Sequence, residues 1–306
     1  MDLRRIFRGV GKSLITVGVL LFLFVAYQLW GTALIERRGQ QALAQELSQR
    51  QLTTPPTLPS SGSPVQVAQK VELPDLGSAV GTMEIPKIGL EKHVVEGVGV
   101  PDLKKGPGHY PGTAMPGTAG NAAIAGHRTT YGAPFFDLDQ LAPGDPIFVT
   151  TSLGRFRYDV RETKIVAPDD AWVLDPTDDN RLTLTTCEPK YSAAKRLIVV
   201  ADLVGDPLDV TFEGDQQPPP LAGEGLEVAA GADVTAGLSG DSSARGPVLL
   251  WGLLTAAIWL GTWTVARRHR PRSRRRWLAY GAALPFFLAG LFVFFENVAR
   301  LLPANV

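Results

Sequence analysis

Three long uncharged stretches constrain this chain more than any other feature of its sequence. Ser13–Ile35 runs for 23 residues without a charged side chain, Gly246–Ala266 for 21, and Trp277–Phe295 for 19. A helix rises about 1.5 Å per residue, so each stretch is long enough to cross a hydrocarbon core about 30 Å thick. The alternative is a buried core helix, which stays most open for the third stretch because it contains Pro285. We predict transmembrane helices over residues 13–35, 246–266 and 277–296.

The distribution of charge predicts how these helices are oriented. The N-terminus 1–12 holds four basic residues, the loop 267–276 holds seven arginines and no acid, and residues 36–245 hold 18 basic and 28 acidic residues. Because positive flanks stay in the cytoplasm, we predict that 1–12 and 267–276 are cytoplasmic and that the acidic middle and the tail 297–306 lie outside. A cleaved signal peptide is the alternative for the first stretch, and it would also export the middle.

This arrangement predicts a multi-pass protein of the plasma membrane with an extracytoplasmic folded domain. The arginine-rich loop is explained by its place between two spans, so we predict no nucleic-acid partner. Polar, proline-rich or glycine-rich segments flank the middle of the chain. Residues 36–76 are interpreted as a polar helix followed by a Pro/Ser-rich linker, and 214–245 as a Gly/Ala/Pro-rich linker. The folded domain is therefore predicted over residues 77–213, long enough for one core.

Short apolar runs between glycine and proline residues fill this domain, a pattern typical of β-strands. Phe135–Leu141 is predicted as a short helix and Asp169–Leu174 as a helical turn. Many short strands with few helices indicate a mainly β fold, either a barrel or a sandwich. The predicted strands are Gly81–Ile85, His93–Val98, Ala122–Ala125, Pro146–Thr151, Phe156–Val166, Leu182–Thr186 and Leu197–Val204.

The single cysteine, Cys187, ends one of these runs, whereas His127 ends another and Arg196 begins a third. A lone thiol in an exported domain has no partner for an internal disulfide. An inert buried cysteine is one interpretation. The other is a nucleophile, with His127 as acid and base and Arg196 stabilising the oxyanion of an acyl transfer. Either water or an amine can resolve the thioester, so hydrolase and transpeptidase both stay open.

The remaining polar candidates receive structural interpretations. His109 is a second candidate base but is interpreted as a hydrogen-bonded loop residue, and His93 as part of a solvated face. The acidic pairs at 169–170 and 178–179 are interpreted as loop solvation, with weak calcium binding as the alternative. No cysteine–histidine pair has metal-ligand spacing, and no glycine-rich phosphate loop follows a strand. We therefore predict neither a metal site nor a cofactor.

The motif Thr183-Leu-Thr-Thr-Cys187 resembles the Thr-Leu-x-Thr-Cys motif of sortases, the membrane-anchored cysteine transpeptidases of Gram-positive bacteria. The arginine and histidine of that family match Arg196 and the His127 of Ala125-Gly-His-Arg128. Met83-Glu-Ile-Pro-Lys-Ile-Gly89 extends the resemblance toward the start of the domain. The resemblance implies an eight-stranded sortase β-barrel with short helices, and the uncharged stretches add transmembrane helices at both ends of the chain.

The resemblance also implies a reaction and its partners. Cys187 would cleave a C-terminal sorting motif between Thr and Gly and pass the surface protein that bears it to a peptidoglycan precursor or another amine. The loops Gly106–Gly117 and Arg128–Pro134 are similar to those of class E sortases of high-GC Gram-positive bacteria, whose motif is Leu-Ala-x-Thr-Gly rather than Leu-Pro-x-Thr-Gly. Residues expected to line the peptide groove are Tyr110, Thr185 and Thr186.

Two C-terminal spans depart from many housekeeping sortases and keep a pilin-polymerising role open. Residues 53–80, however, lack the Asp-Pro-aromatic lid motif of pilin-polymerising enzymes, which argues against that role. An exported cysteine peptidase is a further enzyme hypothesis. A membrane scaffold that displays a non-catalytic β domain is the alternative from another class of protein.

Overall fold

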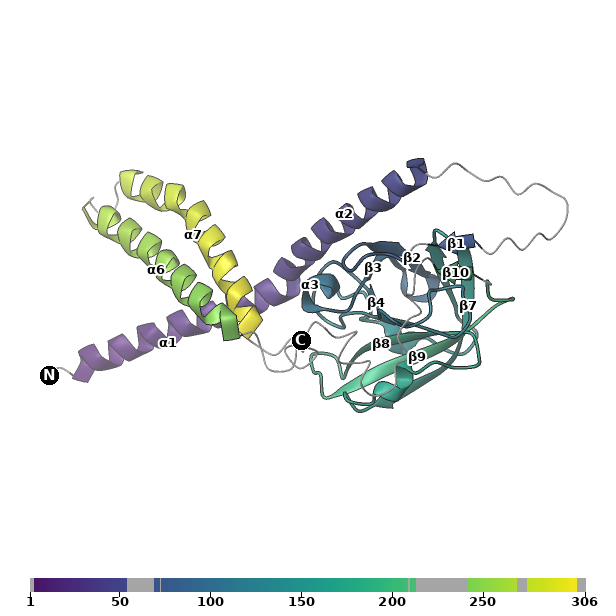
Figure 1. The fold of residues 1–306 in the computed structure, drawn as a ribbon. Coiled ribbons are helices and arrows are strands. Elements are labelled where there is room, and N and C mark those ends of the chain that lie inside the picture. Colours follow the sequence, from purple (N-terminus) through teal and green to yellow (C-terminus); the bar gives the residue numbers. More distant parts are fainter. Residues whose placement is uncertain are drawn as a thin grey trace. The chain divides into compact units, whose positions relative to one another are not determined.

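The computed structural model describes residues 3–53, 69–71, 73–208, 210–212, 242–268 and 274–301. The chain forms two compact units, Met1–Gly31 with Thr235–Ala304, and Thr32–Val234 with the last two residues. Figure 1 labels the elements in chain order. Most of the two predicted linkers, the centre of the arginine-rich loop and the end of the C-terminal tail lie outside the described residues.

The first unit is built from long apolar helices. Helix α1 (Leu3–Ala26) leads into a π-helical turn at Tyr27–Gly31, and α6 (Arg245–Arg267) and α7 (Arg274–Leu301) follow at the other end of the chain. Three stretches in the described residues are long and apolar enough to cross a membrane, namely Leu14–Arg50, Arg245–Arg267 and Trp277–Leu301.

Helices α6 and α7 pack against each other through small residues. A Cβ at Gly290 would lie 2.8 Å from the hydroxyl of Thr255, and one at Gly252 would lie 3.1 Å from the ring of Phe294. Glycine therefore allows the two backbones to approach closely, as is typical of helices that associate in membranes. The two C-terminal apolar stretches form a helical pair.

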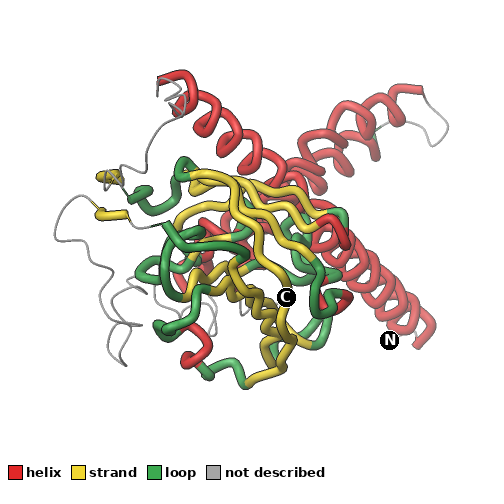
Figure 2. The backbone as a smooth tube through the Cα atoms, turned by 90° about the vertical axis from the view of Figure 1, so that its right-hand side faces the viewer, coloured by secondary structure: helices red, strands yellow, loops and turns green. Residues whose placement is uncertain are grey.

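The second unit is a closed eight-stranded barrel with the strand order β2-β3-β4-β5-β8-β9-β7-β6. Figure 2 shows the strands of this barrel in yellow, joined by green loops. Two neighbouring pairs, β3 with β4 and β5 with β8, are parallel, and the others are antiparallel. The strands are β2 Ala79–Ile85, β3 Leu90–Glu96, β4 Gly108–His109, β5 Asn121–Ala125, β6 Pro146–Thr151, β7 Gly154–Val166, β8 Arg181–Glu188 and β9 Lys195–Leu203.

Alternating apolar residues of these strands point into one core, which explains why the runs fold as strands. The core is closed by Phe135 and Leu138, which are fully buried on the loop that joins β5 to β6. The strand residues that share this core include Met83, Ile85, Ile124, Ile147, Val149, Leu182, Leu184, Leu197 and Val199.

The closed barrel confirms the predicted eight-stranded β-barrel, with four corrections. The description "mainly β" holds for the barrel alone, because the long helices α1, α2 (Thr32–Thr53), α6 and α7 make up much of the chain. The predicted helix Phe135–Leu141 is only a 3-10 turn at Leu138–Gln140, and the predicted helical turn is confined to Ala171–Leu174. Strand β4 was not predicted, because it has only two residues, too few to show the alternation of apolar and polar residues that marks a strand.

Two smaller features complete the second unit. Strands β1 (Gln69–Val71) and β10 (Val210–Phe212) form a separate two-stranded parallel sheet. Helix α2 packs on the barrel, where Leu43 is buried against Ala79 of β2 and Val95 of β3. The sequence predicted a polar helix in this region but gave no sign that it docks on the domain.

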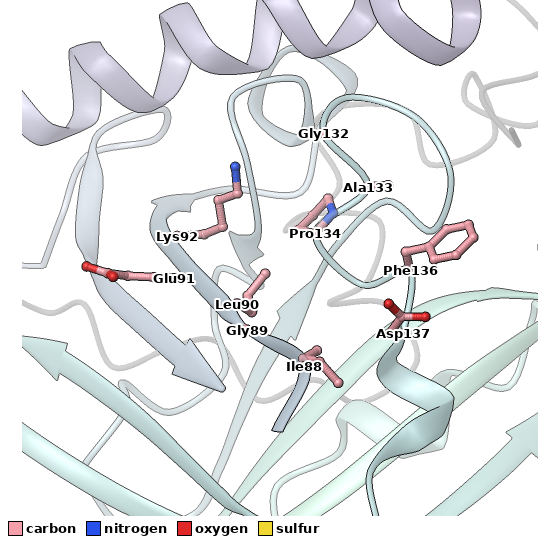
Figure 3. Close-up of a pocket in the computed structure, with 10 residues that line it drawn as sticks. All are labelled: Ile88, Gly89, Leu90, Glu91, Lys92, Gly132, Ala133, Pro134, Phe136 and Asp137. Atoms are coloured by element: carbon pink, nitrogen blue, oxygen red, sulfur yellow. The ribbon is translucent and has the colours of Figure 1, made fainter. Parts of the chain in front are cut away.

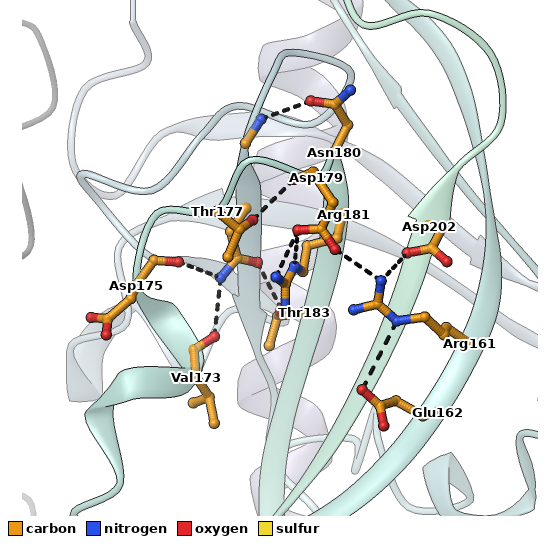
Figure 4. Close-up of polar contacts among 12 residues, drawn as sticks. Arg161, Glu162, Val173, Asp175, Thr177, Asp179, Asn180, Arg181, Thr183 and Asp202 are labelled. Carbon is orange, nitrogen blue, oxygen red and sulfur yellow. Dashed lines mark hydrogen bonds and ion pairs between the residues drawn. The ribbon is translucent and has the colours of Figure 1, made fainter.

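A polar network fixes the start of β8. The Thr183 hydroxyl donates to Asn121 Oδ1 at 2.7 Å, and the Asn121 amide donates to two carbonyls of the preceding loop. The Asp179 carboxylate accepts hydrogen bonds from Arg161 at 2.8 Å and Arg181 at 2.7 Å, as Figure 4 shows. Asp179 is therefore both a partly exposed loop residue and a structural anchor, a second role that the interpretation of the acidic pair at 178–179 did not include.

Candidate active site

Parallel pairing of β5 and β8 brings the ends of these strands together. Ala125 pairs with Thr185, and beyond the strand the Gly126 N–H donates to the Thr185 carbonyl at 3.1 Å. The Thr186 hydroxyl in turn donates to the Gly126 carbonyl at 2.7 Å. The pairing therefore continues past Ala125, and the next residues in register are His127 and Cys187.

The antiparallel pair β8 and β9 adds the third side chain. Cys187 and Arg196 are direct Cα partners in this ladder. The guanidinium of Arg196 donates through Nη1 to the carbonyls of Ala193 and Lys195, at 3.1 and 3.2 Å. These bonds hold the side chain at the end of the loop between β8 and β9. The fold thus brings Cys187, His127 and Arg196 to one end of three adjacent strands.

Burial keeps both the thiol and the imidazole neutral. The pKa of Cys187 is raised by burial, although the charges of Arg196 and Arg128 oppose the rise. The pKa of His127 is lowered to about 4, by burial first and by the charge of Lys104 second. Burial therefore favours a thiol at Cys187 and a neutral imidazole at His127 at neutral pH.

An aromatic ring covers His127. The rings of His127 and Tyr131 lie 5.0 Å apart between centroids, tilted by 36°. The Lys104 ammonium lies 5.7 Å from the centroid of the Tyr131 ring. Tyr131 has a positive φ of 48°, a conformation that costs energy for a residue with a side chain. The loop after His127 is therefore held in one conformation by its surroundings.

Arg128 is a further residue of the site, and the sequence analysis assigned it no role. Its side chain is buried, with 3% exposed, and its guanidinium lies 3.1 Å from Asp139 and 3.4 Å from Glu188. Glu188 follows Cys187 directly, so this ion pair joins the histidine segment to the cysteine segment. The only sequence signal was that Arg128 follows His127 in a motif quoted for its histidine.

The residues predicted to line the peptide groove differ in how their hydroxyls are bound. The Tyr110 hydroxyl lies 3.2 Å from the hydroxyl of Thr185. The pKa of Tyr110 is raised by burial, although its hydrogen bond to Thr185 and the charge of Arg196 oppose the rise. The buried hydroxyl of Thr186 already donates to Gly126. Substrate binding by all three residues stays a prediction.

Known proteins that are similar to this chain identify its family. Residues 83–204 match the family model described as "Sortase domain". Sortase A of Bacillus anthracis is 30% identical over 149 residues, which cover 45% of this chain and 70% of that protein. The chain belongs to the sortase family. The resemblance noted in the sequence is thereby confirmed.

Two class E sortases are also similar to this sortase. Sortase SrtE1 of Streptomyces coelicolor is 34% identical over 213 residues, which cover 64% of this chain and 57% of that protein. This sortase therefore spans little more than half the length of that relative. The structure of sortase E from Streptomyces avermitilis matches with 40% identity and a TM-score of 0.40, covering 44% of this chain and 95% of that one.

The other histidines of this sortase have structural surroundings. His109 is 1% exposed, and its Nδ1 lies 2.8 Å from the carboxylate of Glu96 while its Nε2 lies 2.9 Å from the Ala114 carbonyl. This confirms a hydrogen-bonded residue, although it lies on β4 rather than in a loop. His93 is part-buried on β3, with Nδ1 3.0 Å from the Thr82 hydroxyl, so its face is only partly solvated. His269 lies outside the described residues.

A cavity of about 220 Å³ lies beside the loop that follows His127. Figure 3 shows it between the start of β3, with Leu90 and Lys92, and the loop residues Gly132 and Pro134. In the part of the chain that the structure describes, no group of three or more His, Cys, Asp or Glu side chains could hold a metal ion.

Proposed function

We propose that this protein is a membrane-anchored sortase, a cysteine transpeptidase that joins surface proteins bearing a C-terminal sorting motif to an amine of the cell wall. The observation that carries the proposal is the register of β8, which pairs Cys187 with Arg196 and continues toward His127 on the β5 side. A thiol, an imidazole and a guanidinium on adjacent strand ends are the groups that acyl transfer through a thioester requires.

In the first half of the reaction, Cys187 attacks the carbonyl carbon of the Thr–Gly bond. As the Sγ–C bond forms, the neutral imidazole of His127 accepts the thiol proton. The resulting imidazolium gives this proton to the leaving glycine nitrogen as the C–N bond breaks, which leaves a thioester. In the second half, an amine attacks the thioester, His127 accepts a proton from this amine, and the thiolate leaves and is reprotonated.

Arg196 is proposed to stabilise the oxyanion of both tetrahedral intermediates. The bonds from its Nη1 to Ala193 and Lys195 orient the guanidinium before the substrate arrives. Donors that are fixed in advance need no reorganisation when charge develops on the carbonyl oxygen. A planar guanidinium also offers more than one donor to that oxygen.

Tyr110 and Thr185 are proposed to line the groove for the sorting motif, because their hydroxyls are hydrogen-bonded to each other and Thr185 lies two residues before Cys187 on β8. Thr186 is proposed to lie at the base of this groove, where its bond to Gly126 keeps β5 and β8 in register. The similarity to class E sortases favours Leu-Ala-x-Thr-Gly over Leu-Pro-x-Thr-Gly as the motif.

The proposed location is the plasma membrane, with three spans and the barrel on the extracytoplasmic side. The three candidate membrane helices support anchoring, and the basic segments at 1–12 and 267–276 support the orientation. The proposed partners are surface proteins that bear the sorting motif and a peptidoglycan precursor or another amine acceptor.

Mass spectrometry of the full chain in detergent, incubated with Leu-Ala-x-Thr-Gly and Leu-Pro-x-Thr-Gly peptides, tests the function. With triglycine as the added amine, we expect cleavage between Thr and Gly and a ligated product that depends on the amine. Cys187→Ala should abolish both cleavage and ligation, and full activity in that variant would refute the proposal. Release of a free acid regardless of amine would instead indicate a cysteine peptidase.

A further inference from the structure

Helix α2 docks on the barrel with one face, and most of its contacts are polar. Residues Thr32, Glu36, Gln40, Leu43 and Glu46 recur every three or four positions, so they lie on one side of the helix. Glu46 accepts from the Ala79 N–H at 3.1 Å, and Leu43 is buried beside Ala79. Hydropathy alone gave no sign of this face, because polar groups provide most of its contacts.

The N-terminal end of this face contacts the loop that follows His127. The Tyr131 N–H donates to the Thr32 hydroxyl at 3.1 Å, and Thr32 is fully buried. Glu36, 1% exposed, forms an ion pair with Lys92 at 2.6 Å. A Cβ at Gly132 would lie 2.8 Å from the Glu36 carboxylate, so loop and helix are in close contact. In Figure 3, Lys92 points toward the pale purple helix above the loop.

The middle of the same face contacts the segment that carries Lys104. Gln40 Nε2 donates to the carbonyls of Lys105 and His93, at 2.8 and 2.9 Å, and its Oε1 accepts from the His93 N–H at 2.8 Å. A Cβ at Gly39 would lie 2.7 Å from the Lys105 Cα, so the two backbones almost touch. Helix α2 therefore fixes the residue next to Lys104.

Tyr131 and Lys104 are the two neighbours that act on His127, by ring contact and by charge. Their segments come from different parts of the barrel, and each is hydrogen-bonded to α2. A cavity of about 220 Å³ lies between this loop and the start of β3. We propose that α2 is a positioning element of the active site, in which Thr32 and Gln40 hold these two segments around the His127 imidazole. This inference rests on the proposed role of His127 in the reaction.

Activity of the full chain in detergent tests the proposal, with the sorting peptide as substrate and hydroxylamine as the amine. We expect Thr32→Val and Gln40→Ala to lower kcat by about 10-fold to 100-fold, because small displacements of a catalytic group cost that much. KM should change by less than about threefold, because the contacts described for α2 are with other segments than those of Tyr110, Thr185 and Thr186. Thr32→Ser keeps the hydroxyl and should restore kcat.

Gln41→Ala is the matched control, because Gln41 is the exposed neighbour of Gln40 on the same helix. Equal kcat in Gln40→Ala and Gln41→Ala, or a loss in Thr32→Val that Thr32→Ser does not restore, would overturn the proposal. Thermal unfolding of each variant separates a loss of fold from a loss of position.

A second measurement does not depend on turnover, so it separates this proposal from the proposed function. Deuterium exchange at the imidazole C2 position, followed by mass spectrometry, reports the pKa of each histidine. The charged and titratable groups that face or flank His127 include Lys104, Tyr131 and the adjacent Arg128, and Cys187 lies two residues beyond Thr185, the β8 partner of Ala125.

Release from α2 should admit water to His127 and raise its pKa from about 4 toward its ordinary value of 6.5. We expect this rise in the pKa of His127 in Thr32→Val and Gln40→Ala but not in Gln41→Ala. The pKa of the buried His109 should be the same in all variants. If the pKa of His127 is unchanged in both Thr32→Val and Gln40→Ala, the positioning role of α2 is refuted, even if the protein proves to have another activity.

Discussion

The guanidinium of Arg128 lies 3.4 Å from the carboxylate of Glu188, an ion pair between the residue that follows His127 and the residue that follows Cys187. Arg128 also lies 3.1 Å from Asp139, and its side chain is almost completely buried. The pair extends the parallel register of β5 and β8 by side-chain contact, beyond the last backbone hydrogen bond. It therefore fixes the spacing between the proposed acid–base residue and the proposed nucleophile.

Arg128→Gln should raise the pKa of the Cys187 thiol. Burial already raises this pKa, and the charge of Arg128 is one of two that oppose the rise, so its removal leaves burial less compensated. We expect the pH at which Cys187 is half-alkylated by iodoacetamide to shift upward. Because Cys187 is the only cysteine, the whole signal comes from it. Arg155→Gln, at an exposed pair with Glu84, should leave the profile unchanged, and a downward shift in Arg128→Gln would contradict the prediction.

Arg196→Lys should lower kcat by about 100-fold to 1000-fold, the usual effect of losing an oxyanion donor. The lysine keeps the charge but lacks the planar set of donors. Alkylation of Cys187 should therefore change little, which separates oxyanion stabilisation from an effect on the thiol. Lys195→Arg, at the exposed neighbouring position, serves as the control. Near-normal kcat in Arg196→Lys would show that charge alone suffices.

Tyr110→Phe and Thr185→Val each remove one partner of the hydrogen bond between the two hydroxyls, which lie 3.2 Å apart. If this pair presents a fixed surface to the sorting motif, each change should raise KM for the Leu-Ala-x-Thr-Gly peptide by about threefold to tenfold. The double variant should be no worse than either single variant, because the same bond is lost. Steady-state kinetics of the four proteins checks this, and additive losses would argue against a shared role.

The buried pair of His109 and Glu96 should make the stability of the barrel depend on pH. Burial opposes the charged imidazolium, but the charge and hydrogen bond of Glu96 and the bond to Ala114 outweigh it, so the pKa of His109 is raised above 6.5. The folded state then binds the proton more tightly than the unfolded chain. The stabilisation is fully present below about pH 6.5 and is lost as the pH rises through the folded-state pKa.

Thermal unfolding across this pH range checks the prediction. Glu96→Gln should lower the unfolding temperature below pH 6.5 by several degrees, as expected for a loss of about 1–3 kcal/mol. It should also flatten the dependence on pH. Thr82→Val, which removes the hydroxyl beside the part-buried His93, should leave the pH dependence of the unfolding temperature unchanged. If the unfolding temperature of Glu96→Gln still depends on pH as in the unchanged protein, the pH dependence comes from another group.

Much of the barrel was predictable, because its strands carry apolar residues at alternate positions and end at glycine or proline. Each predicted strand overlaps an observed one, and Leu182–Thr186 lies within β8. Strand β4 was missed because two residues are too short for a pattern. The helix predicted at Phe135–Leu141 is only a 3-10 turn, since its two buried residues, Phe135 and Leu138, are held by the core rather than by a helical face.

The three central site residues were predictable as strand-end positions, but their neighbours were not. Arg128 and Glu188 form a pair only because β5 and β8 are parallel, and no local pattern specifies that pairing. The face of α2 that carries Thr32 and Gln40 could not be predicted from hydropathy, because most of its contacts with the barrel are polar. The role of Tyr131 depends on its ring lying against His127, which requires the loop conformation as well as the sequence.

The parallel pairing of β5 and β8 has a consequence for the order of events during folding. Cys187 lies sixty residues beyond His127, and the intervening chain forms β6 and β7, which belong to the opposite side of the barrel. The ends of β5 and β8 come side by side only after this long loop has closed and the last strands have joined. A newly made chain would therefore carry the thiol without its proposed base. The topology of the sheet itself would delay the proposed acyl transfer until the barrel is finished.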